Sequence, residues 1–381
     1  MHLNNGGGQL VASFIMKGDD KMKKKFYRLD NNLSIDANYR VLLSERNVGK
    51  SYALKEYVIK QAYESNFEKR FVYLRRYDRD ITAPQCNKYF GDIPISKMTN
   101  GDFDGVTYYR GDFYFSKMNA KTFKQERGPV IGYGIALNNA EHYKSLVYSG
   151  VENMIYEEFI TDNLYLPNEP TALQELVSTV ARERDINVWL LGNKIDRVCP
   201  YFTEWELTNA LSQNPGTIDV YTYTHHRADG TEGKTIVTVE QCAVAGSNSS
   251  MFFGSASKSI MGGEWATKEK PHLPKPLTEF TKLYELELQD CGFSFMLNLL
   301  VDESNGGVFL YVYPKTRSYR KVKRVITNVF STDPLTSSRF NDKIRAEVMM
   351  RECINTGKVC YCDNLTGTDF EKVLMSRKGV L

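Results

Sequence analysis

The chain has 381 residues, a length that favours two or three domains and allows a sizeable hydrophobic core. Hydrophobic residues make up 42% and charged residues 25%, which is typical of a soluble globular protein and argues against an intrinsically disordered one. The net charge of +3 is too small to indicate nucleic-acid binding by itself, so that case depends on where basic residues cluster.

Residues 1–39 are glycine-rich and then lysine-rich, and we expect an N-terminal extension there that begins flexibly. Its apolar run LVASFIM (10–16) is too short to span a bilayer, and basic residues follow it rather than precede it, which is the wrong order for a signal peptide. No membrane partner and a cytoplasmic location are therefore expected. The seven cysteines are scattered and odd in number, so they predict reduced thiols rather than disulfides or a zinc site.

Strands and helices alternate from Arg40 onward, which indicates an α/β domain with a mainly parallel sheet at residues 40–240. The patterns predict a strand at 40–43, a helix at 51–64, a strand at 70–76, hairpin strands within 101–137, a buried strand at 152–159, a helix at 171–184 and a strand at 187–191.

Residues 241–279 are rich in glycine and serine and then in proline, and they predict a linker. In the second domain, 280–381, the patterns predict strands at 293–301, 307–313 and 321–330, a helix over 337–357 with serine caps before it and Gly357 after it, a strand at 358–362 and a helix near 368–375. By analogy of element order alone, this resembles a ribonuclease-H-like domain.

The string SERNVGKSYALK (44–55) lies between the first strand and the first helix and ends like a phosphate-binding loop. In such a loop backbone N–H groups surround the phosphates, a lysine reaches the β- and γ-phosphates, and the next Ser or Thr holds Mg²⁺. Ser44 stands where the motif has its first glycine. The candidate loop residues are Ser44, Arg46, Asn47, Val48, Gly49, Lys50, Ser51 and Tyr52. We therefore expect a P-loop NTPase domain in which ATP and Mg²⁺ bind.

Two acids, Glu157 and Glu158, end the apolar strand at 152–159. Such a pair supplies a carboxylate on the Mg²⁺ side and then a general base for the attacking water. The first acid is usually Asp, so Glu157 is a departure with a longer reach. A surface acid pair after a strand is the alternative.

Two further residues follow in the next helix and strand. At about 100° per residue, Arg182 points away from the stripe of Leu173, Leu176, Val177 and Val180 that we expect to be buried. It could reach a nucleotide on a neighbouring subunit as an arginine finger in trans; a solvated charge is the alternative, and Arg184 lies nearer the buried side. Asn193 ends the adjacent strand, where a polar side chain can sense the γ-phosphate.

The string Asn193-Lys194-Ile195-Asp196 matches the guanine-recognition pattern N-K-x-D. GTPases carry D-x-x-G rather than paired acids, however, and their guanine motif comes later in the chain. A GTPase or helicase-like P-loop enzyme stays one alternative. The other is a non-catalytic nucleic-acid-binding protein with a decayed loop, which Ser44 and Glu157 favour.

With loop, acid pair, arginine helix and Asn193 in this order, the chain resembles the DNA-packaging (encapsidation) ATPases of phi29-like tailed phages. The matching strings are NVGKSYALKEYVI, FVYLRRYD, YEEF, LPNEPTALQELVSTVARER and CPYF, within roughly residues 38–205. The resemblance implies that Arg46 is the arginine which the family carries in its loop. It also implies that Glu157 holds the metal, Glu158 activates water, Arg182 acts across a subunit boundary and Asn193 couples the γ-phosphate to movement.

The resemblance further implies a homo-oligomeric ring, apparently a pentamer, that drives double-stranded DNA through the portal of a procapsid. A structural packaging RNA is a further expected partner. The location would be the host bacterial cytoplasm, with transient attachment to the portal.

The segment KTRSYRKVKR (315–324) carries six cations and no acid, and it is the best local candidate for nucleic-acid contact; a soluble edge strand protected by lysines is the alternative. Its candidate residues are Arg317, Arg320, Lys321, Lys323 and Arg324. Nuclease activity would need clustered acids, for which Asp302, Asp363 and Asp369 are available, but we expect a vestigial nuclease fold without activity.

Overall fold

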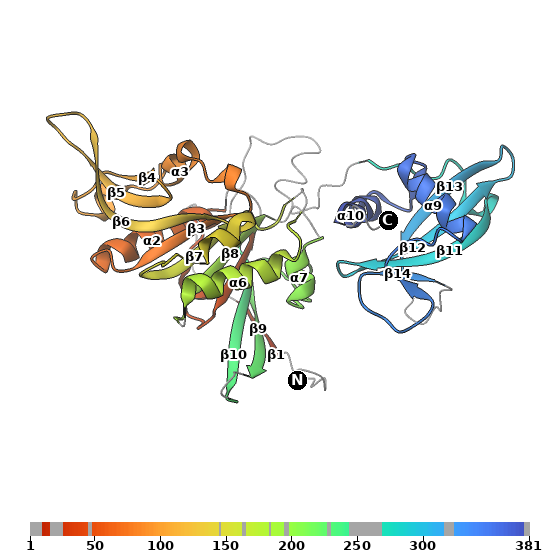
Figure 1. Cartoon of the computed structure of the whole chain (residues 1–381), viewed down its shortest axis with the longest axis horizontal. Helices are drawn as coiled ribbons and strands as arrows, with labels where there is room; N and C mark the ends of the chain where they lie inside the picture. Colours follow the sequence, from red (N-terminus) through yellow and green to blue (C-terminus); the bar gives the residue numbers. More distant parts are fainter. Residues whose placement is uncertain are drawn as a thin grey trace. The chain divides into compact units, whose positions relative to one another are not determined.

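The computed structural model describes residues 10–15, 26–44, 48–144, 146–161, 165–182, 184–193, 198–226, 230–243, 269–315 and 324–376 (Figure 1). The chain forms two compact units. The first holds the described residues of 1–162, 166–195 and 204–264, and the second holds those of 163–165, 196–203 and 265–381.

The first unit is built on one ten-stranded sheet with the order β1-β9-β10-β2-β8-β7-β3-β6-β5-β4. The strands are β1 (Leu10–Ile15), β2 (Tyr39–Ser44), β3 (Arg70–Arg75), β4 (Gly105–Tyr109), β5 (Asp112–Met118), β6 (Gln125–Ala136), β7 (Val151–Glu157), β8 (Asn187–Asn193), β9 (Thr217–His226) and β10 (Glu232–Gln241). The six strands from β10 to β6 are parallel, and antiparallel strands flank them on both sides. The expected α/β class with a mainly parallel sheet is confirmed.

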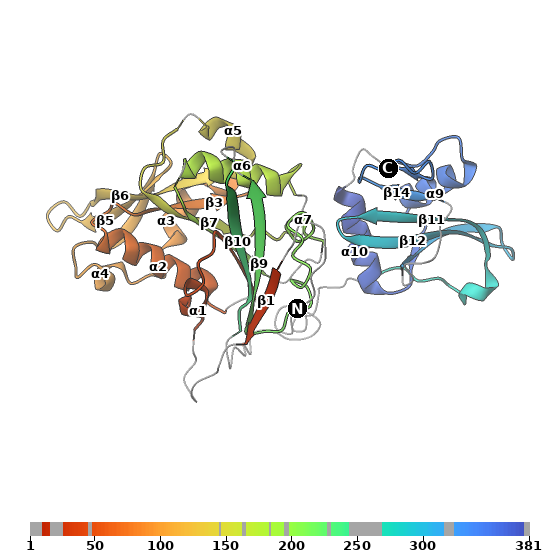
Figure 2. The same ribbon diagram turned by 90° about the horizontal axis from the view of Figure 1, so that it is seen from below.

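Helices cover both faces of this sheet, with α2 and α6 on opposite sides (Figure 2). The helices are α1 (Asp30–Leu33), α2 (Lys50–Glu64), α3 (Ala83–Tyr89), α4 (Ile95–Met98), α5 (Ala140–Tyr143) and α6 (Glu169–Ala181), with 3-10 turns η1 (Asp78–Asp80) and η2 (Leu137–Asn139). The short α7 (Pro200–Glu204) belongs to the second unit up to Thr203. Because both faces are covered, β2, β7 and β8 are nearly continuous apolar runs. Leu54, Val58 and Ala62 of α2 pack on one face with Leu42 and Trp189.

The segment before β2 is part of this unit, although we expected an N-terminal extension up to residue 39. β1 pairs with β9, and Tyr27 and Leu29 lie in the core. A buried polar cluster fixes the segment, because Arg40 donates to the backbone and side-chain oxygens of Asn32 while its guanidinium lies 5.1 Å from the Trp189 ring. These partners are far apart in the sequence, so its local pattern could not reveal them.

The second unit has a six-stranded sheet with the order β15-β14-β11-β12-β13-β16. Its elements are η3 (Leu277–Glu279), β11 (Thr281–Asp290), β12 (Phe293–Asp302), β13 (Gly307–Pro314), β14 (Val325–Thr327), β15 (Thr336–Ser337), α9 (Arg345–Asn355), β16 (Val359–Tyr361) and α10 (Asn364–Ser376). The strands β11, β12 and β13 are antiparallel, and β14 and β15 extend the sheet in parallel. This agrees with the expected ribonuclease-H-like α/β class.

Two expectations for this unit are wrong in detail. The sequence pattern missed β11, and the helix predicted from residue 337 begins at Arg345. The stretch before α9 cannot be helical because Thr336 and Ser337 pair with β14, and Glu347 accepts the backbone N–H of Asn341. The predicted end is correct, since Gly357 follows with a φ of 70°. Within the described residues, no helix is long and apolar enough to cross a membrane.

Candidate functional site

The candidate nucleotide site lies where three neighbouring parallel strands end. β8 lies between β2 and β7, with Ser44 opposite Asn193 and Glu157 opposite Leu191. Because the carboxyl ends of parallel strands meet at one edge of a sheet, the phosphate-loop candidates, Asn193 and the acid pair converge there. The sequence predicted each strand end but not the order that brings them together.

The loop enters α2 through Gly49, which has a φ of 99° and is the residue before the first helical position, Lys50. This left-handed backbone favours glycine, so the glycine of the motif is explained by the turn itself. Val48 is buried, and its carbonyl oxygen accepts the N–H of Tyr27. Arg46 and Asn47, also predicted to bind nucleotide, lie outside the described residues; Tyr52 lies half-buried in the first turn of α2.

Lys50 is held by two polar side chains from neighbouring strands. Its ammonium donates to Ser44 Oγ at 2.7 Å and to Asn193 Oδ1 at 3.1 Å. Burial lowers the pKa of Lys50, while Cys242 and Glu157 act in the opposite direction. The serine in the first-glycine position is therefore a partner of the lysine, and so is the amide oxygen of Asn193. Lys194 and Asp196 lie outside the described residues.

Glu157 is held from both sides. Ser51 Oγ donates to its Oε2 at 3.2 Å, and the hydroxyl of Tyr89, the last residue of α3, donates to its Oε1 at 3.1 Å. Burial raises the pKa of Glu157, and these two hydrogen bonds oppose that rise. A hydroxyl and a carboxylate on adjacent elements fit Mg²⁺, which prefers oxygen ligands. Tyr89 was missed because nothing in its local sequence signals a partner 68 residues away.

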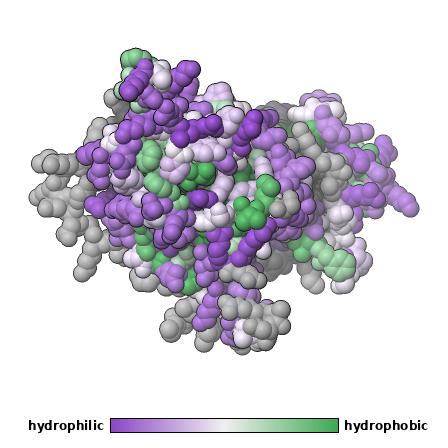
Figure 3. All heavy atoms as spheres, turned by 60° about the vertical axis from the view of Figure 1, so that its left-hand side comes forward, coloured by the Kyte–Doolittle hydropathy of each residue, from purple (hydrophilic) through white to green (hydrophobic). Residues whose placement is uncertain are grey.

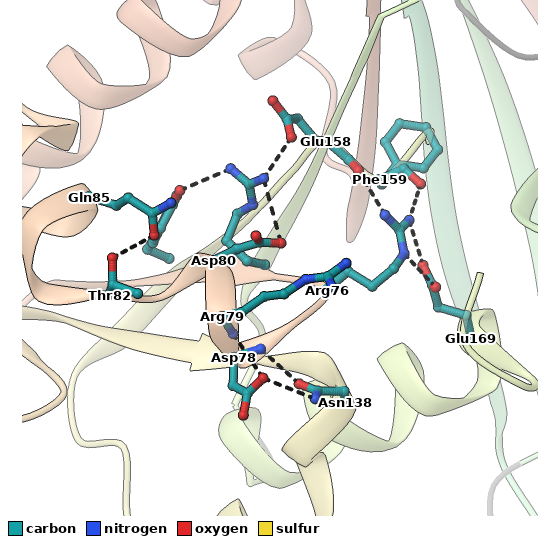
Figure 4. Close-up of polar contacts among 12 residues, drawn as sticks. Arg76, Asp78, Arg79, Asp80, Thr82, Gln85, Asn138, Glu158, Phe159 and Glu169 are labelled. Carbon is teal, nitrogen blue, oxygen red and sulfur yellow. Dashed lines mark hydrogen bonds and ion pairs between the residues drawn. The ribbon is translucent and has the colours of Figure 1, made fainter. Parts of the chain in front are cut away.

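The Glu158 side chain has a different partner from that of Glu157. Its backbone has a φ of 57°, and its carboxylate accepts Arg75 Nη2 at 2.6 Å, from the end of β3. Arg76, the next residue, donates to the carbonyl oxygen of Phe159 and forms a buried ion pair with Glu169 at 2.7 Å (Figure 4). The candidate base is therefore held by an arginine that the sequence reasoning did not single out, although Arg75 and Arg76 end a strand predicted to lie in the same sheet.

Arg182 lies far from this edge in its own chain. It is exposed, caps the end of α6 with a φ of 43°, and donates to the carbonyl oxygen of Leu146 at 2.8 Å. The 13-residue α6 follows β7 and runs back about 20 Å, so its end lies near the start of β7. Arg184 confirms that position, since it donates to Tyr148 O and Val151 O. Arg182 is therefore carried away from the Lys50 site of its own chain.

The predicted nucleic-acid residues give a mixed result. Arg317, Arg320, Lys321 and Lys323 lie outside the described residues. Arg324 is only 13% exposed; it pairs with Glu347 at 2.8 Å and donates to Ser337 Oγ. The charge of Arg324 is therefore paired within the second unit. This corrects its assignment as a surface contact to nucleic acid.

Of the acids considered for a nuclease, Asp302 and Asp363 each accept hydrogen bonds from neighbouring groups. Asp302 accepts hydrogen bonds from Ser304 and Lys275, which lower its pKa to about 2, and Asp363 accepts the N–H of Thr366. Asp369 is buried on α10. On the central strand β11, the buried Glu287 lies 2.6 Å from the Lys315 ammonium. No group of three or more His, Cys, Asp or Glu residues in the described chain could hold a metal ion.

Comparisons with known proteins show the family of the chain. Residues 21–223, more than half of the 381-residue chain, match the family described as Podovirus DNA encapsidation protein (Gp16). The DNA packaging proteins of Bacillus phages PZA and phi29 are each 30% identical to it over 201 residues, 52% of this chain and 55% of theirs. The chain spans about half the length of the curated relatives it matches.

A solved structure of the bacteriophage Phi-29 viral genome packaging motor assembly has a TM-score of 0.51 at 20% identity. That similarity covers 92% of this chain and 99% of the matched one, and it supports the fold.

Proposed function

The chain belongs to the podovirus DNA encapsidation protein family, and from that premise we propose that it is an ATP-driven motor that moves double-stranded DNA into a procapsid through the portal. The observation that carries the proposal is the convergence of Lys50, Ser51, Glu157, Glu158 and Asn193 at one edge of the sheet.

The phosphates of ATP would be bound by the loop N–H groups before α2 and by Lys50. The lysine ammonium then exchanges Ser44 and Asn193 for phosphate oxygens, so Asn193 is released or re-paired when nucleotide arrives. Ser51 and Glu157 would hold Mg²⁺, which neutralises charge on the phosphates. Glu158 would orient and deprotonate the attacking water, and for this its carboxylate has to leave Arg75.

Arg182 is proposed as a finger acting in trans. Since α6 carries it away from the Lys50 site of its own chain, it becomes useful only in a ring of subunits. A pentamer at the portal, and attachment through a structural RNA, are further parts of the proposal and come from the resemblance. Arg317, Arg320, Lys321 and Lys323 of the basic segment are proposed as contacts to DNA phosphates.

The direct test is hydrolysis of ATP and GTP by the full chain, with and without double-stranded DNA, for the wild type and Lys50→Ala. We expect ATP-selective turnover that DNA stimulates and that Lys50→Ala abolishes. A preference for GTP would favour the guanine-specific alternative. Turnover that survives Lys50→Ala would contradict the assignment of this loop, and a wild type that neither binds nor hydrolyses nucleotide would favour the decayed-loop alternative.

A further inference from the structure

A basic hairpin, residues 117–127, joins β5 to β6 and projects from the first unit (Figure 1). It lies near the β4 edge of the sheet, several strands from β2 and Lys50. Its exposed cations are Lys117, Lys121, Lys124 and Arg127, against the single acid Glu126. Figure 3, which brings this side of the chain forward, shows hydrophobic residues exposed among hydrophilic ones.

The tip of the hairpin is an ordered turn built on Asn119. The Asn119 carboxamide oxygen accepts the N–H groups of Lys121 and Thr122, and its amide group donates to Glu126 at 2.6 Å. The Asn119 backbone pairs with Lys124 and Phe123. These hydrogen bonds fix the backbone of the turn from which Lys121, Phe123 and Lys124 project.

Phe123 is the residue of this turn whose conformation and exposure are unfavourable for folding. The residue is 81% exposed and its φ is 52°, a left-handed conformation that bulky residues rarely adopt. A strained backbone and an exposed aromatic ring both work against the fold, so their combination points to a role outside folding.

A second aromatic surface lies on β4 and β5, where Tyr109 pairs with Asp112 at the end of β5 away from the tip. The Arg127 guanidinium lies 4.0 Å from the ring centroid of Tyr109 and 5.6 Å from that of Tyr114, while Arg110 lies 5.2 Å from Tyr109. Tyr109 is 41% exposed. Stacked guanidinium and tyrosine planes are surfaces on which a nucleobase can stack, and each cation can also pair with a phosphate.

We propose that this hairpin binds a nucleic-acid strand with unpaired bases. Phe123 stacks on a base, and Lys121, Lys124 and Arg127 pair with the phosphates around it. Duplex DNA keeps its base faces inside the stack and offers nothing to Phe123, so the chemistry favours single-stranded DNA or an RNA loop. An acidic protein would pair with the lysines but leave the exposed ring unexplained.

This inference rests on the proposed function only in that encapsidation handles nucleic acid, and it uses none of the nucleotide-site residues. An experiment can therefore contradict the hairpin proposal without contradicting the motor proposal, and the reverse. Hydrolysis by Phe123→Ala without nucleic acid is expected to equal that of the wild type. If the wild type hydrolyses no ATP, the motor proposal fails while binding at the hairpin can still be measured.

The test is fluorescence anisotropy of the full chain with three labelled probes: an oligothymidylate, an RNA stem-loop and a blunt duplex DNA. The variants are Phe123→Ala and the double variant Lys121→Gln/Lys124→Gln. The matched controls are Phe330→Ala, which removes a 90% exposed ring from the second unit, and Lys88→Gln/Lys97→Gln, which removes two exposed lysines from the same unit as the hairpin.

We expect Phe123→Ala to weaken binding of the oligothymidylate or the RNA at least about fivefold, and to leave the duplex unchanged. The double lysine variant should reduce the salt slope by about 1.4, roughly 0.7 for each phosphate that a lysine no longer neutralises. Whichever of the two unpaired probes binds more tightly identifies the source of the strand.

Wild-type affinity in Phe123→Ala, an equal loss on the duplex, or a loss of the same size in the two controls would overturn the proposal. Failure of the wild type to bind either unpaired probe at low salt would overturn it as well, and would leave a protein as the partner of the hairpin.

Discussion

The carboxylate of Glu158 lies 2.6 Å from Nη2 of Arg75, an ion pair between the end of β7 and the end of β3. Asp80 lies 3.9 Å from the same guanidinium and is its second acidic neighbour. Glu158 is 65% exposed, so it has room to leave Arg75 without unpacking the core. The proposed base is therefore held in a resting position. Asp80 can compensate the positive charge of Arg75 once Glu158 has moved.

Arg75→Ala should release the base. Because the restraint on Glu158 is removed, we expect severalfold faster ATP hydrolysis without DNA and a smaller ratio of DNA-stimulated to basal turnover. Steady-state hydrolysis with and without duplex DNA measures both. Arg79→Ala is the matched control, since Arg79 lies over Tyr77 and makes no ion pair with Glu158. Unchanged basal turnover in folded Arg75→Ala would show that the pair does not restrain the base.

Tyr89→Phe should weaken metal binding while leaving the fold intact. It removes one hydrogen bond to the Glu157 carboxylate and keeps the ring whose centroid lies 4.2 Å from that of Tyr73. We expect the Mg²⁺ concentration for half-maximal hydrolysis to rise about tenfold. Tyr63→Phe, which removes an exposed hydroxyl bonded to Asp102, is the control. An unchanged Mg²⁺ requirement in Tyr89→Phe would mean that Tyr89 does not position Glu157.

Activation by Mg²⁺ at the Glu157 site should depend on pH in a definite direction. Burial raises the pKa of Glu157, so protons compete with Mg²⁺ at a higher pH than for an ordinary glutamate, and Mg²⁺ activation is lost as the pH falls through that raised value. The Tyr89 hydrogen bond favours the carboxylate form. Tyr89→Phe should therefore move this loss to higher pH, which pH profiles at limiting Mg²⁺ will show; a shift to lower pH would contradict the assignment.

The ion pair of Arg76 and Glu169 should matter more for stability than for chemistry. Glu169 is fully buried, and it also accepts the Tyr156 hydroxyl and the N–H of Leu166. Removing one partner of a buried pair leaves an uncompensated charge, so Glu169→Ala should lower the free energy of unfolding by about 3–5 kcal/mol.

Glu64→Ala, which breaks an exposed pair with Lys60, should cost at most about 0.5 kcal/mol. Denaturant unfolding followed by circular dichroism compares the two variants. Equal small losses in both would contradict the importance of the buried pair.

The sequence predicted those parts of the fold that local pattern controls. The apolar runs of β2, β3, β7 and β8, each ending in polar residues, predicted the parallel sheet and the edge at which the site forms. The strand β11 was missed because the glutamates of YELELQD interrupt its apolar pattern, yet Leu286, Leu288 and Glu287 are all buried. Lys315 provides the charge that makes burial of Glu287 possible, and that partner is 28 residues away.

The same limit applies within the candidate site. The loop motif predicted Lys50 and Ser51 as nucleotide-site residues, and the end of an apolar strand predicted Glu157. The structure brings these three residues together. Tyr89 and Arg75 act on the acids from elements whose place in the sheet is set by tertiary packing. Their roles became visible only when the strand order β2-β8-β7-β3 was known.

The measurement that tests the account most directly is ATP hydrolysis by Lys50→Ala, by Arg182→Ala and by a mixture of the two. Each variant alone should be inactive, because one cannot bind phosphate and the other cannot supply the finger. In a mixed ring, an intact Lys50 site can face a neighbour with an intact Arg182, so the mixture should regain part of the wild-type rate in the presence of duplex DNA. No recovery in mixed rings whose assembly has been verified, or full activity of Arg182→Ala alone, would contradict a motor with a finger in trans.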